Sequence, residues 1–158
     1  MQRRSAVCFL LISFMLAAGC SHRPPYEGRS VAELEKMLAD PSQTVRVQGA
    51  HGLSLHGAEA GPAVPALAQA LQSSDGLLRM QAALALEKIG PGAREAVPQL
   101  IVALDDSEWS VRRQAVLALG QIGPDARSAI PELRRLQRGD PNGLVRRAVE
   151  QALPKIPG

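Results

Sequence analysis

Aromatic side chains are scarce in this sequence, because only four of its 158 residues are Phe, Tyr or Trp. Ala, Val and Leu occupy most apolar positions instead, and such small side chains allow helices to stack closely. The alternating patterns typical of β-strands are absent. The sequence also lacks a G-x-S-x-G turn, a P-loop, a pair of catalytic carboxylates and a Cys–His arrangement. It therefore indicates a helical protein and predicts no catalytic residue and no cofactor.

Long apolar runs are also missing. The run from Ala6 to Ala18 covers thirteen residues and follows Arg3 and Arg4, whereas a membrane-spanning helix needs about 20 residues. A basic start, a short apolar stretch and small residues at its end are typical of a secretory signal peptide. Here the small residues continue directly into Cys20, in the segment LAAGCS.

This segment resembles the lipobox of bacterial lipoproteins. The resemblance implies that residues 1–19 are removed and that the thiol of Cys20 carries a diacylglycerol, with residues 20–29 forming a short tether. Members of the family usually carry Leu where this chain has Ala17, and a small residue is tolerated there. Ser21 implies a lipid-anchored protein on the periplasmic side, in the outer membrane rather than the inner one. An ordinary secretory signal and an uncleaved anchor remain the alternatives.

Cleavage would change the cysteine count and the charge. It would discard Cys8, and a lipidated Cys20 cannot form a disulfide. Loss of Arg3 and Arg4 leaves sixteen basic residues against fifteen acidic ones, a net charge of +1. Such a nearly neutral chain gives no argument for binding nucleic acid.

A unit of about 33 residues recurs along the rest of the chain. AVPALAQAL at 63–71 returns as AVPQLIVAL at 96–104 and as AIPELRRLQ at 129–137. LRMQAALALEKIG at 78–90 likewise returns as VRRQAVLALGQIG at 111–123. Because such a short unit cannot bury its apolar face alone, we expect the units to stack on one another.

Each unit is expected to form two helices. In the second helix of the third unit, apolar residues recur on one face, which places Leu119, and Leu86 one unit earlier, in the core. Gly90 and Gly123 should end the second helices with a left-handed backbone. The apolar face of the third unit consists of Val111, Ala115, Ala118, Leu119 and Ile122.

The starts of the first helices also carry signals. Pro65, Pro98 and Pro131 should lie in the first turn, where no backbone N–H is required. Ser30 and Glu33 predict a capping box at the opening helix.

These second-helix residues resemble the HEAT repeats, in the short form also found in phycobilin lyases. The pattern acidic-x4-V-R-x2-A-x2-A-L-x2-I-G is clearest from Asp106 to Gly123, whereas the second unit has Ser73 in place of the aspartate. The resemblance implies an all-α fold, a right-handed α-solenoid of about four helix pairs over residues 30–158. The expected repeats span residues 30–62, 63–95, 96–128 and 129–158.

Aspartate and arginine recur six residues apart in three units. Asp40 and Asp140 each precede a proline, which predicts an N-cap followed by proline at the first helical position. The arginine six residues later should reach back to that cap or to the adjacent repeat. The pairs are Asp40/Arg46, Asp106/Arg112 and Asp140/Arg146.

His51 and His56 do not form a convincing metal site. They are five residues apart, so they lie about 140° around a helix rather than on one face. We expect no metal ion, and interpret these residues as the more polar side of a capping repeat.

The predicted binding surface lies on the second helices of repeats three and four. Seven basic and eleven acidic residues give −4 for residues 21–109, whereas nine and four give +5 for residues 110–158. An acidic protein surface is therefore the expected partner. Trp109 is expected in the turn between the two helices of the third unit, either as a binding anchor or as a side chain folded over the neighbouring helix. The predicted partner-binding residues are Met80, Trp109, Arg113, Gln114 and Arg147.

Together these observations predict an envelope lipoprotein that acts as a protein-binding scaffold or adaptor without catalysis. The alternative is a lyase-like enzyme subunit similar to the phycobilin lyases. The sequence contains no signal for the oligomeric state.

Overall fold

The computed structural model describes residues 24–157, which form helices and turns without a β-strand. The predicted signal peptide, Cys20 and the first part of the tether lie outside the described residues. No described helix has the length and apolar character needed to cross a membrane. The helices pair as α1 (Val31–Met37) with α2 (Gln43–His56), α3 (Val64–Ala70) with α4 (Gly76–Ile89), α5 (Val97–Ala103) with α6 (Trp109–Ile122), and α7 (Ile130–Gly139) with α8 (Gly143–Ala152).

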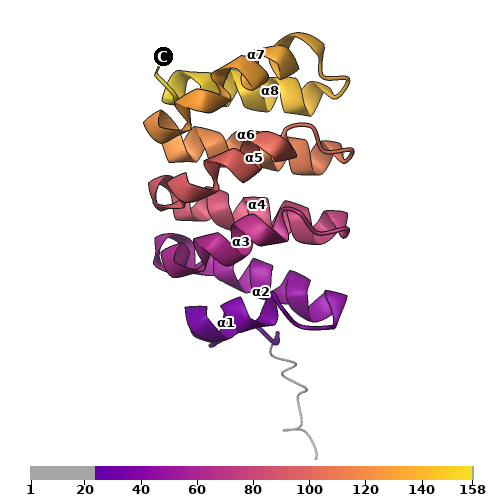
Figure 1. Cartoon of the computed structure of the whole chain (residues 1–158), viewed down its shortest axis with the longest axis vertical. Helices are drawn as coiled ribbons and strands as arrows, with labels where there is room; N and C mark the ends of the chain where they lie inside the picture. The colour runs from indigo at the N-terminus through magenta and orange to yellow at the C-terminus, as the bar shows by residue number, and fades with distance from the viewer. Residues whose placement is uncertain (1–23, 158) are drawn as a thin grey trace, which may run out of the picture.

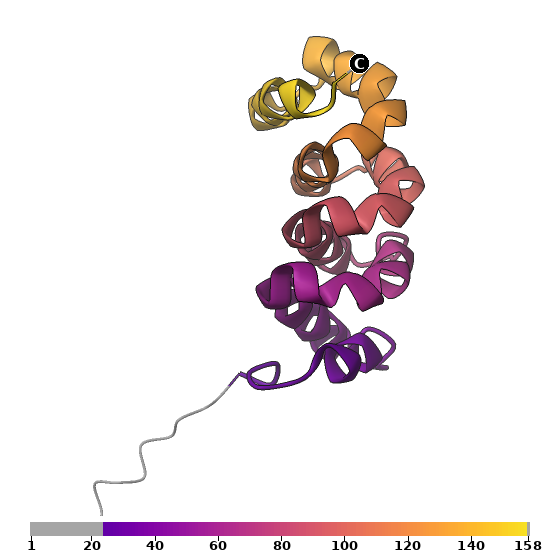
Figure 2. The same cartoon turned by 90° about the vertical axis from the view of Figure 1, so that its left-hand side faces the viewer.

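The four pairs stack in chain order into a right-handed α-solenoid, which confirms the predicted fold (Figure 1). The first helix of each pair lies on one side of the stack and the second helix on the other (Figure 2). The second helices pack directly against one another along the whole stack, whereas successive first helices touch much less. The second helices therefore line the inner, slightly concave side. Short 3₁₀ segments lead from each pair to the next or end the last pair: η1 (Gly57–Ala63), η2 (Gly90–Ala96), η3 (Gly123–Ala129) and η4 (Leu153–Lys155).

Local signals set most of the helix ends as predicted. The Ser30 side chain accepts from the Glu33 backbone N–H while the Glu33 carboxylate accepts from the Ser30 backbone, so the capping box is present. Gly90 and Gly123 follow α4 and α6 with φ of 68° and 77°, values that favour glycine. Pro65, Pro98 and Pro131 all lie in the first turn of a first helix.

The predicted N-caps at Asp40 and Asp140 are wrong. Helix α2 begins at Gln43 after Ser42, and α8 begins at Gly143 after Asn142. Each aspartate instead accepts a hydrogen bond from the backbone N–H two residues later, at 2.8 Å in both turns. The carboxylate therefore closes the turn before the helix, a local bond that aspartate makes as readily as a cap.

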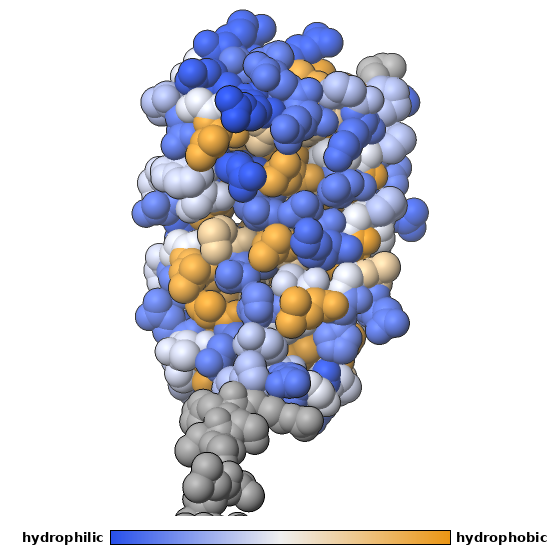
Figure 3. Space-filling model, turned by 180° about the vertical axis from the view of Figure 1, so that it is seen from behind, coloured by the Kyte–Doolittle hydropathy of each residue, from blue (hydrophilic) through white to orange (hydrophobic). Residues whose placement is uncertain are grey.

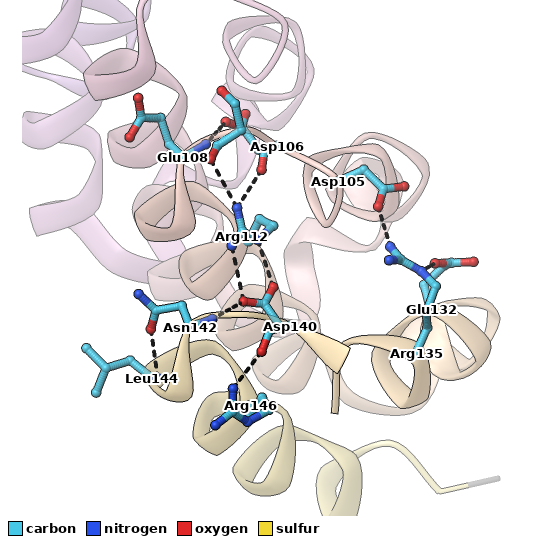
Figure 4. A network of polar contacts seen from close by, with 11 residues as sticks. Asp105, Asp106, Glu108, Arg112, Glu132, Arg135, Asp140, Asn142, Leu144 and Arg146 are labelled. Carbon is cyan, nitrogen blue, oxygen red and sulfur yellow. Dashed lines mark hydrogen bonds and ion pairs between the residues drawn. The ribbon is translucent and has the colours of Figure 1, made fainter. Parts of the chain in front are cut away.

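A ladder of arginine–aspartate pairs links successive repeats, and Figure 4 shows the pair of Arg112 with Asp140. Arg112 donates through Nε and Nη2 to the carboxylate of Asp140 in the next repeat, at 2.8 and 3.1 Å. Its Nη1 donates to the backbone oxygen of Asp106, at 2.8 Å. Arg79 binds the Asp106 carboxylate in the same two-point way, at 2.6 and 2.8 Å. The predicted arginine contacts are thus confirmed, and the guanidinium groups of Arg79 and Arg112 each join two repeats.

The carboxylates of the ladder are stabilised in their charged form. Burial alone would raise the pKa of Asp140, but hydrogen bonds from Arg112 and from the backbone N–H of Asn142 lower it below its ordinary value. The same balance lowers the pKa of Asp106, through hydrogen bonds from Arg79 and the Glu108 backbone. Both groups therefore stay ionised to a lower pH than an ordinary aspartate does.

The first repeat is covered by the chain that precedes it. The ring of Tyr26 meets the ring of His51 edge-on, with centroids 4.9 Å apart, and His56 Nε2 lies 3.1 Å from the backbone oxygen of Arg29. A Cβ atom at Gly52 would lie only 2.9 Å from the Tyr26 Cβ. Residues 24–29 of the predicted tether are therefore packed against α2, and both histidines contribute to that packing.

Candidate protein-binding surface

The second-helix face, meaning the solvent-exposed side of α2, α4, α6 and α8, is the surface on which the sequence places binding. Figure 3 shows this face, with apolar residues over the N-terminal and middle repeats and more polar residues toward the C-terminal end. Arg113 on α6 and Arg147 on α8 are both exposed, as predicted, and Met80 on α4 is half-buried. These three residues occupy equivalent positions in successive repeats, so the helix stack places them in one row along the face.

The prediction that Gln114 faces solvent is wrong. This residue is only 8% exposed, and its Nε2 donates to the carboxylate of Glu87 on α4. Gln114 lies beside the buried residues of α6, and close packing of α4 against α6 covers this edge of the helix. Gln114 therefore holds two repeats together and is removed from the candidate binding residues.

Trp109 lies in α6 as its first residue, not in the turn before it. The residue is 42% exposed, so more than half of its surface packs against the protein. The exposed part leaves apolar area available to a partner at the start of α6.

Two exposed leucines at the starts of second helices were missed by the sequence reasoning. Leu77 and Leu144 are the second residues of α4 and α8, and they are 51% and 47% exposed. Leu77 and Met80 line a shallow hollow of about 320 Å³ together with Ser110 of α6. Leu144 and Arg147 line another hollow, of about 660 Å³, beside Glu150. The repeat register could have identified both leucines, because each occupies the position that Ser110 has in the third repeat.

The basic charge of the C-terminal half divides between two sides of the solenoid. Arg113 and Arg147 belong to second helices and form no ion pair with another described residue. Arg135 lies on the first helix α7, where it pairs with Glu132 and with Asp105 (Figure 4). The second-helix face thus carries its own positive charge, which the pairs on α7 do not neutralise.

No group of three or more His, Cys, Asp or Glu residues within residues 24–157 is arranged to hold a metal ion. The candidate surface consists of a basic row with apolar neighbours, an arrangement that suits contact with another macromolecule.

Comparisons with known proteins agree with this architecture. A family profile described as HEAT repeats matches residues 31–93 and 91–154. A comparison with curated proteins gave no match.

Several solved structures are similar in fold. An engineered protein has a TM-score of 0.65 and 25% identity over 79% of this chain, which spans 61% of that protein. The complex of CpcE and CpcF of phycocyanin lyase from a Nostoc species has a TM-score of 0.66 and 20% identity, over 78% of this chain and 79% of that one. Human deoxyhypusine hydroxylase has a TM-score of 0.63 and 32% identity over 84% of this chain, which spans 45% of the enzyme.

Proposed function

The chain belongs to the HEAT-repeat family, and on that premise we propose that it is a non-catalytic scaffold or adaptor that binds a protein partner through the second-helix face of repeats three and four. The observation that carries this proposal is the exposure of Arg113 and Arg147 in one row, without an ion-pair partner among the described residues. Unrelated activities share repeat folds, so the argument rests on this surface and not on the fold.

The partner is expected to present acidic side chains. The residues from 110 to 158 carry nine basic and four acidic side chains, a net charge of +5. An acidic surface would be attracted to the arginines, while Leu144 and Trp109 would supply apolar contact. Binding should weaken with salt, because the Debye length falls from ~10 Å at 0.1 M to ~3 Å at 1 M.

Charge reversal tests this surface. A partner captured by crosslinking in membranes should bind the Arg113→Glu, Arg147→Glu double variant about tenfold more weakly or worse, a loss of roughly 1.4 kcal/mol. The physical reason is that two attractive contacts become repulsive while both side chains stay exposed and the fold stays intact. Affinity is measured by titration calorimetry at two salt concentrations.

The matched control is Arg134→Glu with Arg138→Glu. This variant makes the same change in net charge on the first helix α7, where both arginines are exposed. Reversal of Glu33 would be a poor control, since its carboxylate closes the capping box of α1. Equal losses in the two double variants, or an affinity that ignores salt, would count against the proposed surface.

We further propose that the protein is an envelope lipoprotein, anchored through Cys20 on the periplasmic side, with the outer membrane favoured over the inner one. The support is the order of a basic start, a short apolar run and the segment LAAGCS. Stable anchoring needs more than one acyl chain, at ~0.8 kcal/mol per buried CH₂. Attached there, the solenoid would be held close to a membrane.

Metabolic labelling with palmitate tests the anchor. The wild-type protein should become labelled, and Cys20→Ser should lose the label and accumulate in an unprocessed or soluble form. Cys8→Ser is the control, because Cys8 lies in the segment that is removed and should leave the labelling unchanged. Absence of label in the wild-type protein would contradict the lipoprotein proposal.

A lyase-like enzyme subunit is the second candidate function. Its support is the structural likeness to the CpcE–CpcF complex, which at 20% identity bears on the fold alone. Incubation with a bilin pigment distinguishes the two, since a lyase-like subunit should acquire a visible absorption band and a scaffold should not.

A further inference from the structure

The ladder that joins the repeats lacks one carboxylate. Asp106 and Asp140 receive the arginine of the preceding repeat, but the equivalent position in repeat two is Ser73. The Ser73 hydroxyl accepts from the backbone N–H of Asp75 at 3.1 Å, as the aspartates do in their own turns. Serine therefore preserves the turn, but it supplies no carboxylate for the arginine of repeat one.

That arginine is held in the same way as its counterparts. Arg46 Nη1 donates to the backbone oxygens of Asp40 and Pro41, at 2.8 and 2.9 Å. Arg112 Nη1 makes the equivalent two contacts, while its Nε and Nη2 bind Asp140. Within residues 24–157, Nε and Nη2 of Arg46 have no such partner. The Nη1 contacts match those of Arg112, so we expect the remaining two-donor edge of Arg46 to face the adjacent repeat at Ser73, which lines the same cleft.

The space beside this edge is larger than its counterpart one repeat later. A cleft between α1 and α3, here the α1/α3 cleft, has a volume of about 640 Å³ and is lined by Arg46, Ser73 and Leu78, among others. The equivalent cleft between α3 and α5 has a volume of about 320 Å³. Ala39 and Ala66 line the larger cleft, and the smaller one has Gln72 and Gln99 at the same repeat positions. The short side chains therefore leave space in the cleft at the junction between repeats one and two, where the ladder lacks its carboxylate.

The charge in the cleft favours an anion. Arg46 and Lys36 line it together with Glu35, so the cations outnumber the carboxylates. Residues 1–23 contain no Asp or Glu, so the segment outside the described residues has no acidic side chain to place there. At the next two junctions, the group that the equivalent arginine binds is an aspartate carboxylate, that of Asp106 or Asp140.

We propose that the α1/α3 cleft binds an acidic side chain of a partner protein, whose carboxylate takes the position that Asp106 and Asp140 occupy at the next two junctions. The Nε and Nη2 edge of Arg46 would hold both oxygens, and the small apolar residues of the cleft would enclose the stem of the side chain. This site lies away from the second-helix face. The proposal therefore does not depend on whether that face binds a partner.

The test uses the signal of the Arg46 Nε–H group in nuclear magnetic resonance spectra of the ¹⁵N-labelled protein. The probe is N-acetyl-aspartate N′-methylamide, compared with N-acetyl-asparagine N′-methylamide, which has the same shape without the charge. The aspartate probe should move the Arg46 signal saturably and leave Arg79 and Arg112 unmoved, because their carboxylate positions are filled. The asparagine probe should leave all three signals in place.

Two variants make the outcome decisive. Ser73→Asp should move the Arg46 signal without any probe and weaken probe binding at least tenfold, because the missing carboxylate is then supplied within the chain. Ala39→Gln with Ala66→Gln, which copies the smaller cleft, should weaken probe binding while leaving the Arg46 contacts intact. A response of Arg46 no larger than that of exposed Arg113, equal responses to the two probes, or unchanged binding in Ser73→Asp would each overturn the proposal.

Discussion

Replacing Leu119 by alanine is expected to lower the free energy of unfolding by roughly 2–5 kcal/mol. Leu119 is completely buried in the core of the solenoid, as is its counterpart Leu86 one repeat earlier. The substitution removes buried methyl groups and leaves a cavity that a stack of closely packed helices can fill only in part. Because four repeats share one continuous core, the loss should extend beyond the third repeat. Urea unfolding followed by circular dichroism measures it.

Gln121→Ala is the control for this prediction. Gln121 lies two residues further along α6 and is exposed, so its replacement should change the stability by less than about 0.5 kcal/mol. Similar losses at Leu119 and Gln121 would show that the assignment of buried and exposed sides of α6 is incorrect.

The second large effect is expected at Asp140, whose side chain is only 1% exposed beside Arg112. Asp140→Ala should cost roughly 3–5 kcal/mol, because it leaves the largely buried guanidinium of Arg112 without its counter-charge. Asp40→Ala is the matched control. Asp40 closes the same kind of turn, through Ser42, but forms no ion pair among the described residues. Its loss should cost about 0.5–1.5 kcal/mol, and an equal loss in the two variants would contradict a role for the ladder in stability.

The two ladder carboxylates, Asp106 and Asp140, also predict how the stability of the protein depends on pH. The pKa of Asp140 and that of Asp106 are lowered in the folded protein from an ordinary value of 3.8. Their contribution to stability is therefore fully present above that value and is lost as the pH falls through the lowered pKa values. Unfolding curves between pH 5 and pH 2 should show this loss, and Asp140→Ala should make the dependence on pH shallower.

Much of the fold could be predicted from local pattern. The spacing of Val111, Ala115 and Leu119 fixes the buried side of α6, and all three are fully buried. Gly123 ends that helix with a positive φ, as expected. These features depend on residues within one or two helical turns of each other, so the sequence contains the information directly.

The candidate surface was predictable only in part. Arg113 and Arg147 are exposed as the helix periodicity indicates, but Gln114, one residue further on, is buried against Glu87. Periodicity gives the direction of a side chain around its own helix, and it says nothing of how closely the next helix approaches that edge.

What the sequence determined by itself was the number of repeats, their period and the side of each helix that is buried, since these follow from short-range spacing. Only the tertiary structure decided the contacts between repeats. Asp140 was predicted to cap its own helix, yet its carboxylate binds Arg112, 28 residues earlier. The sequence shows that Ser73 replaces the aspartate of the other repeats. The consequence, Arg46 beside a cleft of about 640 Å³, is visible only once the helices are stacked. The physical reason is that a hydrogen-bonding side chain can choose between a local and a distant partner, and the packing of neighbouring repeats determines which one lies within reach.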